Sequence, residues 1–169
     1  MDDKNLDHLI QNPNGRQFWI KPVGHPDLPV DEHRPYDAPI IRIEFANNPL
    51  AIKGGDILIV YRIKISKLIY VAEALSTSFK TTDEEIRKEP WRLRWPWIIE
   101  AKNLTPEYGA SWARYSLKPF ALAKEYNQED AVEKAKIGGL KFGSDKLRIS
   151  QGFALFMLKK IRQLHTTGV

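Results

Sequence analysis

Two consecutive β-prone runs near the middle of this chain limit the folds that it can adopt. The first run covers 56–63, follows Gly54-Gly55, and places apolar side chains alternately on the two faces of a strand. The second run covers 65–75 and keeps the same β character. We expect the two runs to form neighbouring antiparallel strands, and therefore a domain built around a β-sheet.

Length and composition favour one globular domain. The chain has 169 residues, of which 43% are hydrophobic and 28% charged, and this suffices for one sizeable core. Residues 1–16 are polar and predict a flexible N-terminal tail, so the single domain is expected over 17–169.

No run of about 18 apolar residues predicts a spanning helix, and the start lacks the layout of a signal peptide. We therefore expect a cytoplasmic protein without a membrane partner.

Other elements are predicted with less regular patterns. Further strands are expected at 18–20, 39–45 and, on a weaker pattern, 117–123. The stretch 92–99 alternates large apolar residues with arginines, but Pro96 cannot donate a ladder hydrogen bond. This strand should therefore lie at a sheet edge or begin at Trp97.

Three helices are expected, of which the last has the clearest pattern. One begins after Thr82, which precedes a run of acids, and one follows Asn127 and ends before Gly138. The last begins at Ser150, and its apolar residues follow helical spacing: Phe153, Phe156, Met157, Ile161 and Leu164.

The usual signatures of catalysis and metal binding are missing from the sequence. The chain has no Cys, which excludes disulfides, thiolate nucleophiles and Cys-containing metal sites. No phosphate-binding loop, nucleophile elbow or zinc-spaced His pair is present. The nearest metal-like cluster lies on the Pro-rich loop 23–39, where such side chains are more often solvated: His25, Asp27, Asp31, Glu32 and His33. We expect no catalytic residue, no cofactor and no metal.

Aromatic residues interleaved with basic ones are the main indication of function. Trp91, Trp95 and Trp97 fall within seven residues, beside Arg92 and Arg94, and the net charge is +5. Aromatic faces stack on bases while guanidinium groups hold phosphates, so this composition suits a nucleic-acid site. Tryptophan at alternating strand positions is also typical of a core.

The order of motifs resembles that of the EVE domain, a member of the PUA-like group that also includes the YTH and ASCH domains. The first strand with its Lys-Pro, 18–22, is similar to the opening strand of that family. The Gly-Asp strand 55–61, the strand 69–74 with Thr82-Asp83 after it, and 97–101 resemble the strands that follow. The segments 117–120 and 147–150 resemble the closing part of the domain. The long loop 23–39 and the segment 108–112 depart from the family pattern.

This resemblance implies an α+β fold: a PUA-like, curved and mostly antiparallel β-barrel of five to six strands, flanked by two to four short helices. It also implies a non-catalytic module that binds DNA or RNA and reads a modified base flipped into an aromatic pocket. By position, the expected pocket residues are Trp19, Tyr61, Trp95 and Trp97, with the hydroxyls of Ser76, Thr77 and Ser78 at the base edge. The expected phosphate contacts are Lys21, Arg62 and Arg94.

Two alternatives stay open. An enzyme on the same barrel, such as a hydrolase or nuclease of the ASCH type, would need a group such as Lys21, Lys53 or Asp56 near the pocket. A protein-interaction module would use Trp91 and Trp112 as exposed anchors.

Overall fold

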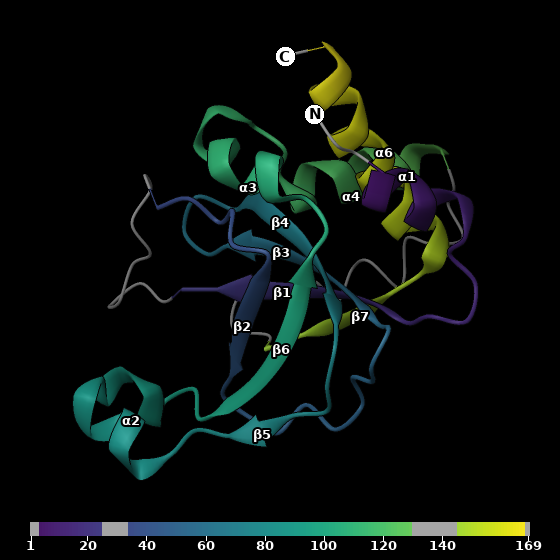
Figure 1. The fold of residues 1–169 in the computed structure, drawn as a ribbon. Coiled ribbons are helices and arrows are strands. Elements are labelled where there is room, and N and C mark those ends of the chain that lie inside the picture. Colours follow the sequence, from purple (N-terminus) through teal and green to yellow (C-terminus); the bar gives the residue numbers. More distant parts are fainter. Residues whose placement is uncertain (1–3, 25–33, 130–144, 168–169) are drawn as a thin grey trace.

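The protein folds around one curved sheet with helices at its ends (Figure 1). The structure is a computed structural model, and it describes residues 4–24, 34–129 and 145–167. The strands are β1 Phe18–Val23, β2 Ile40–Phe45, β3 Ile57–Arg62, β4 Lys67–Ala74, β5 Phe79–Lys80, β6 Trp97–Asn103 and β7 Leu147–Ile149. The helices are α1 Lys4–Gln11, α2 Asp83–Lys88, α3 Pro106–Ser111, α4 Pro119–Glu129 and α6 Gln151–Thr167, with 3₁₀ turns η1 Pro90–Leu93 and η2 Trp112–Arg114.

The strand order is β2-β6-β4-β3-β1-β7, and β5 pairs with β6. The pairing of β1 with β3 is parallel, and the other pairings are antiparallel. The predicted α+β class with a curved, mostly antiparallel sheet and flanking helices is confirmed, and so is the predicted pairing of β3 with β4. The sheet has seven strands, however, where five to six were predicted, and the described residues form five α-helices, where two to four were predicted.

The sheet is also not closed into a complete barrel. Among the described residues, the edge strands β2 and β7 share no ladder of backbone hydrogen bonds. The carboxylate of Asp145, just before β7, instead accepts hydrogen bonds from the backbone of Ala46 and Asn47, just after β2, both at 3.2 Å. A side chain therefore joins the two edges at this end.

The core lies between the sheet and the helices α1, α4 and α6, which Figure 1 shows together at one end. Every residue of β3 is buried. The predicted stripe on α6 is confirmed for Phe153, Met157 and Ile161, which are fully buried. The Ser150 hydroxyl accepts a hydrogen bond from the backbone of Phe153 and begins this helix. No described helix has both the length and the apolar character that crossing a bilayer requires.

The N-terminal segment differs from the predicted flexible tail. Residues 4–11 form α1, and its Leu6 and Leu9 belong to the buried core. Asp7 also pairs with Arg162 on α6 at 2.7 Å. The two leucines are separated by three positions and therefore lie on one face of the helix, which packs against α6.

Three further predictions can be compared with the structure. The weak strand at 117–123 is instead the start of α4, whose first residue is Pro119, a position that proline favours because its missing N–H is not needed there. For the stretch 92–99, the alternative that the strand begins at Trp97 is confirmed: η1 ends at Leu93, and β6 starts at Trp97 and lies between β2 and β4. Asn127 lies inside α4, and the helix expected up to Gly138 falls outside the described residues.

Candidate nucleic-acid interface

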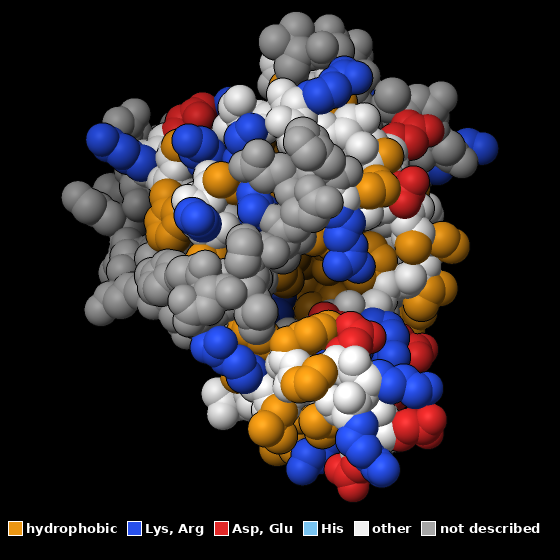
Figure 2. All heavy atoms as spheres, turned by 90° about the vertical axis from the view of Figure 1, so that its left-hand side faces the viewer, with side chains coloured by type: hydrophobic (Ala, Val, Ile, Leu, Met, Phe, Trp, Pro, Cys, Tyr) orange, Lys and Arg blue, Asp and Glu red, His pale blue; other side chains and the backbone are white. Residues whose placement is uncertain are grey.

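A cavity of about 850 Å³ lies beside the 3₁₀ turn η1, which follows α2 along the chain. It is enclosed by three stretches that are far apart in the sequence, together with Tyr70 on β4: the end of β1 with Gly24, the segment 34–44 that includes most of β2, and the segment 89–95 around η1. Figure 2 shows the hollow, with apolar side chains on its floor and Lys or Arg side chains around its opening.

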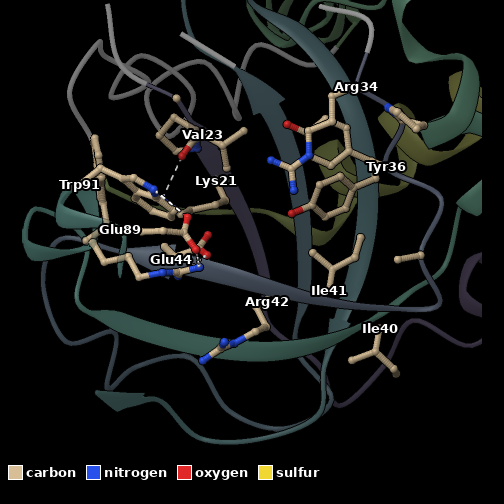
Figure 3. A pocket seen from close by; sticks show the side chains of 17 residues that line it. Lys21, Val23, Arg34, Tyr36, Ile40, Ile41, Arg42, Glu44, Glu89 and Trp91 are labelled. Carbon is tan, nitrogen blue, oxygen red and sulfur yellow. Dashed lines mark hydrogen bonds and ion pairs between the residues drawn. The ribbon is translucent and has the colours of Figure 1, made fainter. Parts of the chain in front are cut away.

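Aromatic side chains form two walls of the cavity. Trp91 and Trp95 line one side, with ring centroids 6.3 Å apart. Tyr36 and Tyr70 line the other, with centroids 5.4 Å apart. Figure 3 shows Trp91 and Tyr36 on opposite sides of the hollow. A planar ligand between them would find aromatic surface on both sides.

Arginines lie over several of these rings. The guanidinium of Arg92 is 4.5 Å from the centroid of Trp91, and that of Arg34 is 5.3 Å from the centroid of Tyr36. Arg94 lies 5.2 Å over Trp95. Cation–π contacts of this kind hold the planar groups in place and bring positive charge to the mouth of the cavity.

Lys21 is the deepest charged residue of the cavity. It pairs with Val60 on β3, which in turn pairs with Tyr70 on β4, so the three side chains project from one face of the sheet. The Lys21 ammonium donates to the Pro22 carbonyl at 2.9 Å and to Asp145 Oδ1 at 3.4 Å. The residue is 3% exposed, and this burial lowers the pKa of its amine despite the nearby carboxylates.

Glu44, on β2, carries the charge opposite to that of Lys21. Its carboxylate Oε1 lies 3.5 Å from the guanidinium of Arg92. Burial raises the pKa of Glu44, and the positive charges of Arg92 and Lys21 offset only part of this effect. The pKa of Tyr70 is raised well above its usual value, first by burial and then by the charge of Glu44. Perturbed ionisable groups of both signs in one cavity are typical of functional sites.

The wall that carries Trp91 belongs to a small lobe made of α2 and η1. The Thr82 hydroxyl accepts a hydrogen bond from the backbone of Glu85 and so caps α2, as the sequence predicts. Glu89 then accepts from Trp91 Nε1 at 2.9 Å, which fixes the indole at the cavity edge. The lobe contacts β2 through an ion pair between Arg42 and Glu85 at 3.1 Å and through the contact of Arg92 with Glu44.

The structure brings only two of the predicted site residues, Lys21 and Trp95, to the cavity. Trp19 lies in the core, where its indole donates to Asp56 Oδ2 at 3.2 Å. Tyr61 is also buried, with its ring against Phe120. These two positions therefore correct the pocket predicted from the sequence.

The other predicted residues also lie outside the cavity lining. Arg62 is buried, with its guanidinium 5.9 Å from the ring of Trp112, so it is not at the surface where a phosphate contact was expected. Trp97 packs partly buried against the core at the start of β6. Arg94 is exposed beside Trp95.

The hydroxyl residues predicted to contact the edge of a base, Ser76 to Ser78, follow β4 and lie away from the cavity. Ser78 donates to the side chain of Asn48, and Thr77 is exposed. Ser76 is half-buried, and none of the three residues lines the cavity.

The residues named for the alternative functions are also placed. Asp56 is buried and accepts hydrogen bonds from Gln17, Trp19 and the backbone of Lys53, so it holds the turn before β3 together. Trp112 is 1% exposed and is therefore not a surface anchor. The metal-like cluster on 25–33 lies outside the described residues, and the described part of the chain contains no group of three or more potential ligands.

Most residues of the cavity were not predicted from the sequence. Tyr36 lies in a loop and Tyr70 in a buried strand, and neither position carries a local signal for a binding role. Glu44 is a carboxylate within an otherwise apolar strand run, which is the one signal that could have identified it.

No protein-family model matches the chain, and a search of curated proteins found no match. Solved structures do match. One is a hypothetical protein from Leishmania major, with a TM-score of 0.55 and 9% identity, covering 89% of this chain and 97% of that one. Human THYN1 in complex with 5-methylcytosine-containing DNA matches with a TM-score of 0.49 and 9% identity, covering 86% of this chain and 97% of that one. The first similarity shows a shared fold, and the second, with a TM-score below 0.5, is too distant to bear on function.

Proposed function

We propose that this protein binds nucleic acid and takes one extruded base into the cavity between Trp91 and Tyr36. The observation that carries the proposal is the lining itself: aromatic walls, arginines at the rim and a charged pair at depth. The volume of about 850 Å³ lies in the range of small-molecule sites and leaves room for a nucleoside.

The energy balance supports an aromatic cavity for this task. Extruding a base from a stack costs a few kcal/mol. Stacking on an aromatic side chain returns about 1–3 kcal/mol per base. Two opposed walls, with Trp91 on one side and Tyr36 on the other, would therefore offset this cost. Arg34 and Arg42 at the cavity are well placed to contact the phosphates on either side of the base.

In finer detail, we propose an EVE-type, PUA-like module that reads a modified base. The motif order supports the family, and the apolar side chains of Val23 and Ile41 in the lining would contact an added methyl group. A probe with and without the modification should then differ in affinity for the wild-type protein. DNA and RNA are both compatible with this cavity.

Substitution of Trp91 tests the proposal. Trp91→Ala removes a stacking wall and should weaken binding of a labelled oligonucleotide by about 5- to 150-fold, the equivalent of about 1–3 kcal/mol. The dissociation constant is measured by fluorescence anisotropy. Leu50→Ala is the matched control, because Leu50 is 76% exposed and lies outside the cavity lining. Unchanged affinity in Trp91→Ala would contradict the proposal.

A hydrolytic enzyme remains the second candidate function because of Lys21 and Glu44. Their pKa values are displaced in the directions that suit a general base and a general acid. Incubation with nucleotides and divalent metals, followed by chromatography, would reveal turnover. Loss of any such turnover in Lys21→Met would support this reading, and the absence of turnover would remove it.

A further inference from the structure

The Tyr36 wall of the cavity belongs to a segment that has little apolar burial of its own. Residues 34–39, which we call the strap, lie in no helix or strand, and none of them is buried. Figure 3 shows Arg34 and Tyr36 on the side of the hollow opposite Trp91. Such a segment needs hydrogen bonds to keep one conformation, because apolar burial does not offset the entropy that is lost when it is ordered.

Asn103, the last residue of β6, supplies several of these hydrogen bonds. Its side-chain amide donates to the carbonyls of Tyr36 at 2.9 Å and Ala38 at 3.1 Å. Its backbone N–H donates to the Pro39 carbonyl at 2.9 Å. The Oδ1 of Asn103 accepts from the backbone N–H of Thr105 at 3.0 Å, which fixes the orientation of the amide. Asn103 is 3% exposed, so its side chain is a rigid anchor for the strap.

The segment after β6 holds the other part of the strap. The backbone N–H of Tyr36 donates to the carbonyl of Gly109 on α3 at 2.9 Å. The Trp112 indole donates to the carbonyl of Arg34 at 2.8 Å. A Cβ at Gly109 would lie 1.9 Å from the Tyr36 carbonyl oxygen. The strap can therefore approach α3 this closely only because residue 109 is a glycine.

These contacts join the two segments whose sequences depart from the family pattern. The strap is the described end of the loop 23–39, and Gly109 and Trp112 belong to the segment 108–112. Neither Asn103 nor Gly109 lines the cavity. Their influence on the cavity must therefore pass through the strap.

We propose that Asn103 and Gly109 are positioning residues that hold Tyr36 in place as a wall of the base site. This inference rests on the proposed function. Stacking requires the ring of Tyr36 at a fixed spacing from Trp91, and a strap that is already held in the free protein does not have to be ordered when the base binds. The two residues raise affinity by this preorganisation, without touching the base.

Gly109→Ala is the most selective change to this arrangement. Gly109 lies within α3, where alanine is intrinsically the better helix former, so the added methyl group acts mainly by displacing the strap. Gly54→Ala is the matched control. A Cβ at Gly54 meets only the Leu75 carbonyl oxygen, at the ordinary contact distance of 3.9 Å.

The position of Tyr36 can be followed without any ligand. The protein is labelled with 3-fluorotyrosine, and the ¹⁹F NMR signal of Tyr36 is identified by its loss in Tyr36→Phe. This signal should shift or broaden in Gly109→Ala and stay unchanged in Gly54→Ala. An unchanged Tyr36 signal in Gly109→Ala would overturn the inference, whatever the protein binds.

A double-mutant cycle then tests whether the effect on binding passes through Tyr36. The probe is a fluorescein-labelled oligothymidylate with one central cytosine, titrated by anisotropy. Tyr36→Ala and Gly109→Ala should each weaken binding by about 5- to 150-fold, the value of one stacking partner. In the Tyr36→Ala background, Gly109→Ala should cost no more than about twofold, the usual departure from additivity. A full additional loss in that background would overturn the inference.

Asn103→Asp provides a second test if Gly109→Ala does not fold, as judged by circular dichroism. The aspartate keeps the size of the side chain and the acceptor for Thr105, but it loses both donors to the strap. The same changes in the Tyr36 signal and in the cycle are expected.

Failure of the inference differs from failure of the proposed function. Wild-type binding that Trp91→Ala weakens but Gly109→Ala leaves unchanged would overturn the inference and keep the proposed function. Absence of binding by the wild-type protein would overturn the proposed function, and with it the role of Asn103 and Gly109 in base binding.

Discussion

At the scale of single residues, Glu44 links the site to the stability of the fold. Its carboxyl is held on β2 beside Arg92 and Lys21, and burial is the main cause of its raised pKa. The folded protein therefore holds the Glu44 proton more tightly than the unfolded chain does.

This linkage predicts how the stability of a Glu44 variant depends on pH. Because the folded-state pKa lies above the ordinary value of 4.5, the stabilising contribution of protonated Glu44 is complete below about that pH and is lost as the pH rises through the folded-state pKa. Glu44→Gln does not titrate. The free energy of unfolding of Glu44→Gln, relative to wild type, should therefore increase from pH 4.5 toward neutral pH.

Urea denaturation across this pH series provides the measurement. Glu100→Gln makes the same change in net charge on the exposed side of β6 and serves as the control. A stability difference for Glu44→Gln that stays flat, or that falls with rising pH, would mean that burial does not dominate the ionisation of Glu44.

Trp19 was predicted to line the pocket but lies in the core, and it shows why the sequence alone does not identify single site residues. Trp19 and Lys21 are two positions apart on β1, so strand periodicity correctly places them on the same face. Strand periodicity does not show which end of that face is covered by other elements of the protein. Asp56 binds the Trp19 indole inside the core, while Lys21 reaches the cavity at the other end of the strand.

At the scale of elements, the lobe of α2 and η1 is attached to the sheet differently from the other helices. Neither α2 nor η1 contains a buried residue, whereas α6 buries several. Among the described residues, two ion pairs join the lobe to β2: Arg42 with Glu85, and Arg92 with Glu44. Opening of the lobe would expose little apolar surface, so its free energy cost is small.

Hydrogen exchange should show this difference directly. The amides of Ile86 and Glu89, which bond to carbonyls within the lobe, should exchange much faster than that of Val71 on β4. Oligonucleotide binding should slow exchange in the lobe, because the base contacts Trp91 and holds the wall in place. Exchange in α2 as slow as in β4 would instead show that the lobe is a rigid part of the core.

The elements that could be predicted are those with a repeated local pattern. The pair β3 and β4 has long apolar runs, and α6 has an apolar stripe over several turns, so their packing is specified locally. Helix α1 has only Leu6 and Leu9 on its buried face, too few for a recognisable stripe. Its helical structure depends on the contact with α6, which periodicity does not reveal.

At the scale of the whole molecule, the cavity exists only because the chain folds back on itself. The end of β1, the segment 34–44 and η1 meet there, although they are separated by many residues in the sequence. The sequence indicated the chemistry, aromatic rings with arginines and a positive net charge of +5, but not which rings would meet. Trp91, Trp95 and Tyr36 line one cavity, while Trp19 and Trp112 are in the core.

Cross-linking can locate the bound base on the protein. An oligothymidylate carrying one central 5-bromocytosine is irradiated with the protein, and the cross-linked residues are mapped by mass spectrometry. We expect cross-links to the aromatic walls of the cavity, at Trp91, Trp95, Tyr36 or Tyr70. Cross-links confined to residues outside the cavity, with these four positions unmodified, would contradict the claim that the base enters it.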